Sequence, residues 1–206
     1  LSSEAPFAPI RWRNKIFIKI GFGGSLFKYI ANSCHVAEVA SYEMDENIKT
    51  YVVPPTAIIN LNPEKWNKNK KDQTGSLQVF VKDVVEAKKF LGLNKMYRPI
   101  KTFNKENMPQ LADELFDKLV INDVISGNFD RHSENWLVQV DKKNPTKAKN
   151  IVLIDGGMAF SPTHPIASLE RRKQYAWANT AFMWAQRRFT NQAKEIIEDV
   201  FRRRFI

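Results

Sequence analysis

Two short polar motifs could together carry out group-transfer chemistry. Residues 128–135 read Asn-Phe-Asp-Arg-His-Ser-Glu-Asn, and Asp155-Gly-Gly follows a short apolar run. A positioned carboxylate such as Asp130 can take the proton of a hydroxyl nucleophile. Mg²⁺ binds oxygen ligands and accepts one or two from a protein, here Asn135 and Asp155. The pattern predicts phosphoryl transfer from Mg-ATP, with Asp130 as the base and Asn135 and Asp155 as metal ligands.

The neighbouring elements decide between this chemistry and an ordinary turn. Asn, Asp, Ser and Gly are common in turns, so an isolated Asp-x-x-x-x-Asn is more often structural than catalytic. Residues 111–121, however, have helical apolar spacing. Residues 136–140 and 151–154 are typical of strands, with a polar turn over 141–150. This order of helix, loop, strand, turn, strand and Asp-Gly is that of a kinase catalytic core.

The first part of the chain is expected to hold the nucleotide phosphates. Residues 15–20 alternate like a strand, and Lys19 near its end is the candidate for contacting the phosphates. Residues 35–44 have the spacing of an amphipathic helix, on which Glu38 could pair with Lys19. The same pair could equally be an exposed ion pair of little energetic weight. The reserve candidates are Lys28 and Glu43.

A glycine cluster at residues 21–24 could suggest a phosphate-binding loop. It follows Lys19 instead of preceding it, and Lys28 is not followed by Ser or Thr, so we expect a turn. Residues 1–10 contain no glycine that could supply an upstream loop. How the phosphates are held therefore stays open at this point.

The other segments complete a coarse map of the chain. The prolines at 54 and 55 predict a turn before a strand at 56–59. We expect a surface loop at 60–74, a strand at 75–81 and an adenine-binding hinge at 81–84. The end of the chain, residues 175–205, is expected to form two amphipathic helices.

His132 beside Ser133 could also suggest a hydrolase triad, but the chain has no Gly-x-Ser-x-Gly motif. We expect the ring to hydrogen-bond the loop or Asp155. A zinc site would need His35 or His164, and no ligand spacing supports one.

Composition excludes several other classes. The chain has 206 residues, 43% of them hydrophobic, which is enough for a sizeable core. Its one cysteine excludes an internal disulfide. No apolar run approaches the roughly 18–20 residues that span a bilayer, so we expect no stable membrane insertion. The net charge of +10 comes from dispersed clusters without a recognition motif, so no specific nucleic-acid partner is expected.

The motifs as a set resemble the atypical kinases that include the HipA-type, Fam20-type and type II phosphatidylinositol 4-kinase groups. The resemblance is carried by the following segments: residues 17–19, 37–43, 53–56, 127–132 and 154–157. In size and basic character the chain is most similar to the HopBF family of bacterial type III effectors. That resemblance implies secretion into the cytoplasm of a host cell and a serine or threonine acceptor in a host protein, with the chaperone HSP90 as the implied partner.

We therefore expect a single α+β domain over residues 1–206 with a minimal, two-lobed protein-kinase-like fold. A small β-rich lobe would reach about residue 81, and a mainly helical lobe would occupy about 82–206. The expected activity is that of an ATP- and Mg²⁺-dependent protein kinase. The alternatives are a phosphoinositide kinase with the same core and a pseudokinase that binds without turnover.

Overall fold

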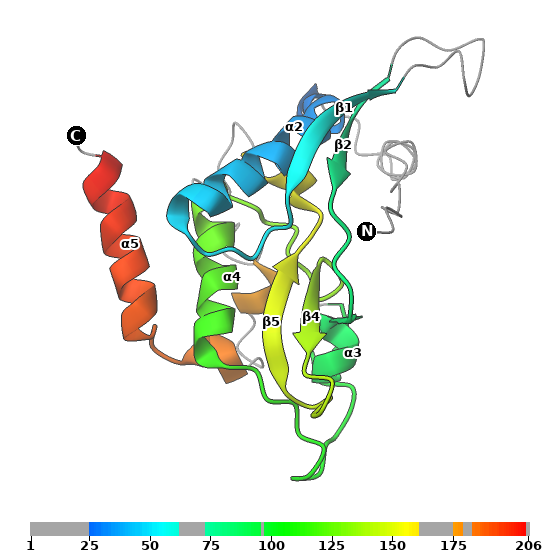
Figure 1. The fold of residues 1–206 in the computed structure, drawn as a ribbon, viewed down its shortest axis with the longest axis vertical. Helices are drawn as coiled ribbons and strands as arrows, with labels where there is room; N and C mark the ends of the chain where they lie inside the picture. Colours follow the sequence, from blue (N-terminus) through cyan, green and yellow to red (C-terminus); the bar gives the residue numbers. More distant parts are fainter. Residues whose placement is uncertain (1–24, 62–72, 96, 161–174, 179–182, 205–206) are drawn as a thin grey trace.

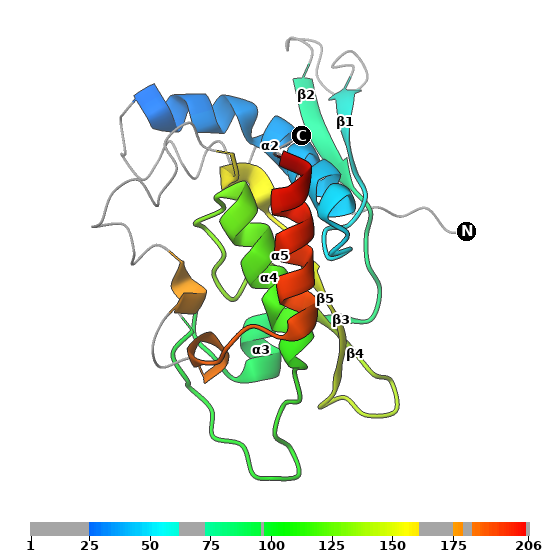
Figure 2. The same cartoon turned by 90° about the vertical axis from the view of Figure 1, so that its left-hand side faces the viewer.

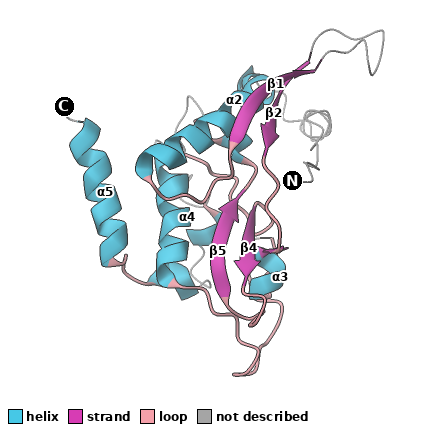
Figure 3. Cartoon of the chain, viewed as in Figure 1, coloured by secondary structure: helices cyan, strands magenta, loops and turns pink. Residues whose placement is uncertain are grey.

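The computed structural model describes residues 25–61, 73–95, 97–160, 175–178 and 183–204. The expected strand at 15–20, the glycine cluster at 21–24 and Lys19 all lie outside these ranges. Within them, helices and two small sheets are mixed along the chain, as Figure 3 shows by colour. The architecture is thus α+β, as the sequence predicts.

One end of the molecule is built from a long helix and a hairpin (Figure 1). Helix α2 spans Ser25–Ile48 and is longer than the predicted 35–44. Strands β1 (Thr56–Leu61) and β2 (Gln73–Gln78) pair antiparallel, with Thr56 opposite Gln78. The end of β1 and the start of β2 therefore lie inside the segment 60–74 that was expected to be a surface loop. Helix α2 packs against this hairpin.

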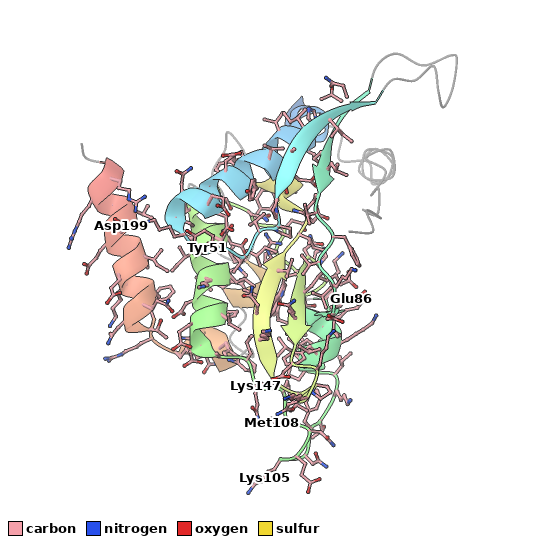
Figure 4. All side chains as sticks on the ribbon, viewed as in Figure 1. Tyr51, Glu86, Lys105, Met108, Lys147 and Asp199 are labelled. Atoms are coloured by element: carbon pink, nitrogen blue, oxygen red, sulfur yellow. The ribbon has the colours of Figure 1, made fainter. Side chains whose placement is uncertain are left out.

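The second sheet carries the strand that leads to Asp155. Strands β3 (Val84–Glu86), β4 (Trp136–Val140) and β5 (Ala148–Leu153) are antiparallel in the order β3-β4-β5. Trp136 lies opposite Leu153, so the start of β4 and the end of β5 meet. The β4–β5 turn lies at the far end, where Figure 4 places Lys147 near Met108 and Lys105. The two polar motifs, residues 128–135 and Asp155-Gly-Gly, consequently lie at the end of this sheet that faces α2.

Three further α-helices lie in the described part of the chain. Helix α3 (Ala87–Leu91) directly follows β3, and α4 (Asp113–Ser126) leads into the loop that contains Asp130. Helix α5 (Asn191–Arg204) lies beside α4, as Figures 1 and 2 show. Ala193 of α5 packs with Ile121 of α4 and Ile48 of α2 in one apolar cluster.

The main core lies between the second sheet and α4. Trp136, Leu119 and Ile151 are completely buried there, with Leu153 and Phe116 almost so. Each apolar side chain removed from water stabilises the fold by roughly 1.5–3 kcal/mol. The core therefore fixes the position of α4 relative to β4 and β5, and hence of the loop between them.

Several boundary predictions were wrong because contacts with distant segments set the ends of the elements. Two amphipathic helices were expected over residues 175–205, but the described residues there form one α-helix. Trp177 and Trp184 instead lie in short 3-10 turns, from which they pack against the core. The expected strand at 75–81 ends at Gln78, and Val84 of the expected hinge already pairs with Gln139. The division into two lobes and the boundary near residue 81 stay expectations. No helix in the described ranges has the length and apolar character needed to cross a membrane.

Candidate active site

The loop that carries Asp130 begins with a sharp turn at the end of α4. Gly127 ends the helix in the left-handed conformation (φ 64°), which glycine adopts without strain. Asn128 is 1% exposed, and its Oδ1 accepts the backbone N–H of Asp130 at 3.1 Å. The turn and this side-chain bond together fix the backbone at Asp130.

A hydrogen bond joins Asn135 to Asp130 across the loop. Asn135 Nδ2 donates to the carbonyl oxygen of Asp130 at 2.9 Å, and the N–H of His132 donates to the same oxygen at 2.8 Å. Because the amide nitrogen of Asn135 is used in this bond, its amide oxygen is the atom suited to a cation. The Asn135 side chain is thus fixed on the backbone of Asp130.

Asp155 is brought to the same place by β5. The N–H of Ile154 donates to the carbonyl oxygen of Asn135 at 3.1 Å, so the strand end lies directly on the loop. Asp155 adopts the left-handed conformation (φ 59°), which Asp tolerates better than most residues. The chain then turns into a 3-10 helix at Gly156–Met158. The structure therefore brings together Asp130, Asn135 and Asp155.

The two glycines after Asp155 are explained by their contact with α2. A Cβ on Gly156 would lie 2.7 Å from Ser41 Oγ, and one on Gly157 would lie 3.1 Å from Cys34 Cβ. A side chain at either position would crowd this close approach of turn and helix. The same stretch of α2 carries Glu38, whose backbone lies 3.7 Å from the Cβ position of Gly156.

Glu38 faces β2 and accepts a hydrogen bond from the Ser76 hydroxyl. The predicted pairing of Glu38 with Lys19 stays a prediction, because Lys19 lies outside the described residues. Glu43, the reserve candidate on the same helix, is exposed. Glu38 is thus placed between the hairpin and the Asp-Gly-Gly turn.

His132 hydrogen-bonds the loop, as expected from the sequence. Its Nδ1 accepts the N–H of Glu134 at 3.3 Å. Burial and the positive charge of Lys95 lower the pKa of the ring to about 4. His132 is consequently neutral near pH 7.

Sequence reasoning missed the residues that support the loop. The buried pair Arg131–Asp123 lies directly behind it, with Nε of Arg131 3.0 Å from Asp123 Oδ1. Burial raises the pKa of Asp123 to about 6, against the opposing effects of Arg131 and a hydrogen bond from Trp177. One sequence signal was available: an acid in the last turn of a helix is disfavoured by the helix dipole and needs a compensating partner.

Helix α3 supports the same loop from another side. The Lys88 N–H donates to the Ser133 carbonyl oxygen at 3.0 Å, and the Lys88 ammonium pairs with Glu134. The Ser133 hydroxyl donates to the Asn94 carbonyl oxygen at 2.8 Å. These contacts hold the middle of the loop, between Asp130 and Asn135.

The donor set suits a hard cation that shares its coordination sphere with phosphate. Asp155 offers a carboxylate and Asn135 an amide oxygen, the ligand types that Mg²⁺ takes in sites that bind nucleoside triphosphates. Among the described residues, no group of three or more His, Cys, Asp or Glu side chains could hold a metal.

The structure has the arrangement of a kinase-like α+β domain: helix α4, the loop that contains Asp130, strands β4 and β5, and the Asp-Gly-Gly turn. In a comparison with protein-family models, residues 4–174 match Phosphatidylinositol 3- and 4-kinase. Because the match covers most of the sequence, this chain belongs to the phosphatidylinositol 3- and 4-kinase family.

Individual relatives point to one branch of that family. The chain is 25% identical to "Phosphatidylinositol 4-kinase LSB6" of Saccharomyces cerevisiae, over 92% of this chain and 41% of the relative. It is 27% identical to mouse "Phosphatidylinositol 4-kinase type 2-beta", over 79% of this chain and 44% of the relative. It is 22% identical to zebrafish (Danio rerio) "Phosphatidylinositol 4-kinase type 2-alpha", over 97% of this chain and 51% of the relative. The chain thus spans about half the length of these relatives or less.

These matches support the atypical-kinase resemblance and refine it. The relation to type II phosphatidylinositol 4-kinases is supported. The closer likeness to HopBF effectors is not shown, and neither is an effector role.

Proposed function

We propose that this protein is a lipid kinase that transfers the γ-phosphoryl group of ATP to an inositol hydroxyl of phosphatidylinositol. The observation that carries the proposal is the bond between Ile154 and Asn135, which brings Asp130, Asn135 and Asp155 together in a chain of this family. The relatives named above, all phosphatidylinositol 4-kinases, support a lipid acceptor over a protein serine or threonine.

Asp130 would act on the acceptor. Its carboxylate orients the inositol hydroxyl and takes its proton as the bond to phosphorus forms, which is worth roughly 10²–10⁴-fold in rate. Its backbone is fixed by Asn128 and Asn135, so the carboxylate starts from a defined position. Such preorganisation is the main contribution a protein makes to phosphoryl transfer.

Asn135 and Asp155 would hold the metal, and Glu38 would orient Lys19 toward the nucleotide phosphates. When bound, Mg-ATP supplies the phosphoryl group and the positive charge that offsets its developing negative charge. The protein's part is to keep both ligands on one edge, which the contact between loop and strand achieves. The glycine-to-Ser41 contact keeps α2, and with it Glu38, next to Asp155.

The test offers lipid and protein acceptors in parallel. The full chain is incubated with γ-labelled ATP and Mg²⁺, with phosphatidylinositol vesicles in one arm and HSP90 in the other. We expect label on the lipid, reduced at least about 100-fold by Asp155→Ala, since loss of a metal ligand removes several kcal/mol of charge stabilisation.

Asp199→Ala is the matched control. Asp199 lies on α5, away from the sheet that carries Asp155 (Figure 4), and its pairing with Arg203 is largely exposed. It should keep wild-type transfer. Label on HSP90 alone would favour the protein-kinase hypothesis, and no label in either arm would favour a pseudokinase.

A further inference from the structure

Arg131 joins the two segments that carry the proposed metal ligands. Its side chain is 3% exposed, and Nη1 donates to the carbonyl oxygens of both Asn135 and Ile154. Asn135 is itself a proposed ligand, and Ile154 directly precedes the other, Asp155. One guanidinium nitrogen therefore sets the spacing between the loop and the end of β5.

Asp123 holds the opposite side of the same guanidinium group. Its Oδ1 accepts from Arg131 Nε at 3.0 Å, and the residue is 0% exposed in the last turn of α4. The planar guanidinium offers donors in a rigid fork, so a bond at Nε determines the direction of Nη1. The orientation of Arg131 is thus set by α4 and transmitted to the ligand segments.

The second oxygen of Asp123 is held by a segment from much later in the chain. Trp177 Nε1 donates to Asp123 Oδ2 at 3.1 Å. The indole is fixed by ring contacts, with its centroid 4.8 Å from that of Tyr175 and 6.4 Å from that of Phe116. Because both carboxylate oxygens are engaged, a change at Trp177 alters the freedom of Asp123 and then of Arg131.

The geometry points to a positioning relay from Trp177 through Asp123 to Arg131, which sets the separation of Asn135 and Asp155 and so the metal affinity of the site. The link to metal affinity rests on the proposed function. Relay residues act through the ligand segments, as outer-shell partners do in other metal sites. Residues 175–178 are thereby coupled to the catalytic loop.

A mild substitution tests the relay without removing the buried ion pair. Arg131→Ala or Asp123→Ala would leave an unpaired buried charge and could unfold the protein. Trp177→Phe removes only the N–H and keeps an aromatic ring in the same place. Trp184→Phe is the matched control, because Trp184 Nε1 donates to the Leu111 carbonyl oxygen at 3.2 Å, outside the relay.

Amide hydrogen exchange reads the relay directly and needs no turnover. The amides of Asn135 and Ile154 bond to the carbonyl oxygens of His132 and Asn135, so they report on the loop and its junction with β5. We expect Trp177→Phe to speed their exchange about threefold or more and Trp184→Phe to leave it unchanged. Unchanged exchange in Trp177→Phe, or an equal rise in both variants, would refute the relay.

The effect of the relay on metal binding is measured as the rate of phosphoryl transfer to phosphatidylinositol at different Mg²⁺ concentrations. Outer-shell changes typically cost 10–100-fold in metal affinity, and Trp177 lies two hydrogen bonds beyond Arg131, so we expect a rise of about 3–10-fold in half-saturating Mg²⁺. The KM for ATP at saturating Mg²⁺ should stay the same. Faster exchange with unchanged Mg²⁺ dependence would disprove this link. Absence of transfer by the wild type would refute the proposed function, while the exchange result would still decide the relay.

Discussion

The buried carboxylate of Asp45 accepts four hydrogen bonds, and its removal gives a sharp prediction. The residue is 0% exposed near the end of α2. Its Oδ2 accepts the N–H groups of Val52 and Val53, both at 2.9 Å. Its Oδ1 accepts the Thr50 hydroxyl and, at 2.9 Å, Asn122 Nδ2 of α4. Asp45 thus joins α2, the following loop and α4.

The expected magnitude follows from the donors left behind. Asp45→Ala would leave two backbone N–H groups, one amide N–H and the Thr50 hydroxyl without the carboxylate that accepts their hydrogen bonds. Each unsatisfied buried donor costs about 1–3 kcal/mol, so unfolding free energy should fall by at least about 3 kcal/mol. Asp45→Asn keeps an acceptor for Val52 and Val53 but presents donors to Asn122, so its cost should be about 1–2 kcal/mol.

Urea denaturation followed by circular dichroism measures both variants. Glu46→Ala is the control, because Glu46 is the neighbouring acid and is exposed. Its effect should stay within about 0.5 kcal/mol. A loss below about 1 kcal/mol for Asp45→Ala, or equal losses for Ala and Asn, would refute the assignment of this network.

Two further predictions concern the candidate site. His132 has a pKa lowered from 6.5 to about 4 in the folded protein. Between these pH values, the ring is protonated in the unfolded chain but stays neutral in the folded one. The free energy of unfolding should then fall by about 2 kcal/mol between pH values above 6.5 and pH 4.5. This loss should be absent in His132→Asn when the urea midpoints of the two proteins are compared. Parallel pH profiles of wild type and variant would contradict the prediction. Gly156→Ala should destabilise by about 1–3 kcal/mol, because its Cβ would meet Ser41 Oγ at 2.7 Å, and Ser41→Gly should relieve part of that loss in the double variant. Additive losses in the same denaturation assay would show that the two residues do not touch.

Elements with strong local patterns were predictable from the sequence. Strand β4 was predicted at its observed bounds, because a polar loop and a polar turn limit its apolar run. Helix α4 was recognised from its apolar spacing and from Gly127, which ends it. Asp130 and Asn135 were singled out from the spacing of their motif, and the hydrogen bond between them lies within the same loop.

Features that depend on distant partners were not predictable. Strand β3 has three residues and exists because Leu137–Gln139 pair with it, so its first residue, Val84, fell at the end of the segment expected to be a hinge. Trp177 and Trp184 were assigned to amphipathic helices from their spacing. The spacing does not reveal that the Trp177 indole bonds Asp123 of α4, or that the Trp184 indole bonds Leu111, just before α4. The Arg131–Asp123 pair depends on burial between α4 and the loop, which the sequence does not display.

We propose that Asp130, Asn135 and Asp155 form one phosphoryl-transfer site for a lipid acceptor. The most direct measurement is the rate of label transfer from γ-labelled ATP to phosphatidylinositol at increasing Mg²⁺, for wild type, Asp130→Asn and Asn135→Ala. The base variant should lose roughly 10²–10⁴-fold at every Mg²⁺ concentration, whereas the ligand variant should recover in part as Mg²⁺ rises. Transfer at the wild-type rate by Asp130→Asn, or an identical Mg²⁺ response from both variants, would contradict the account.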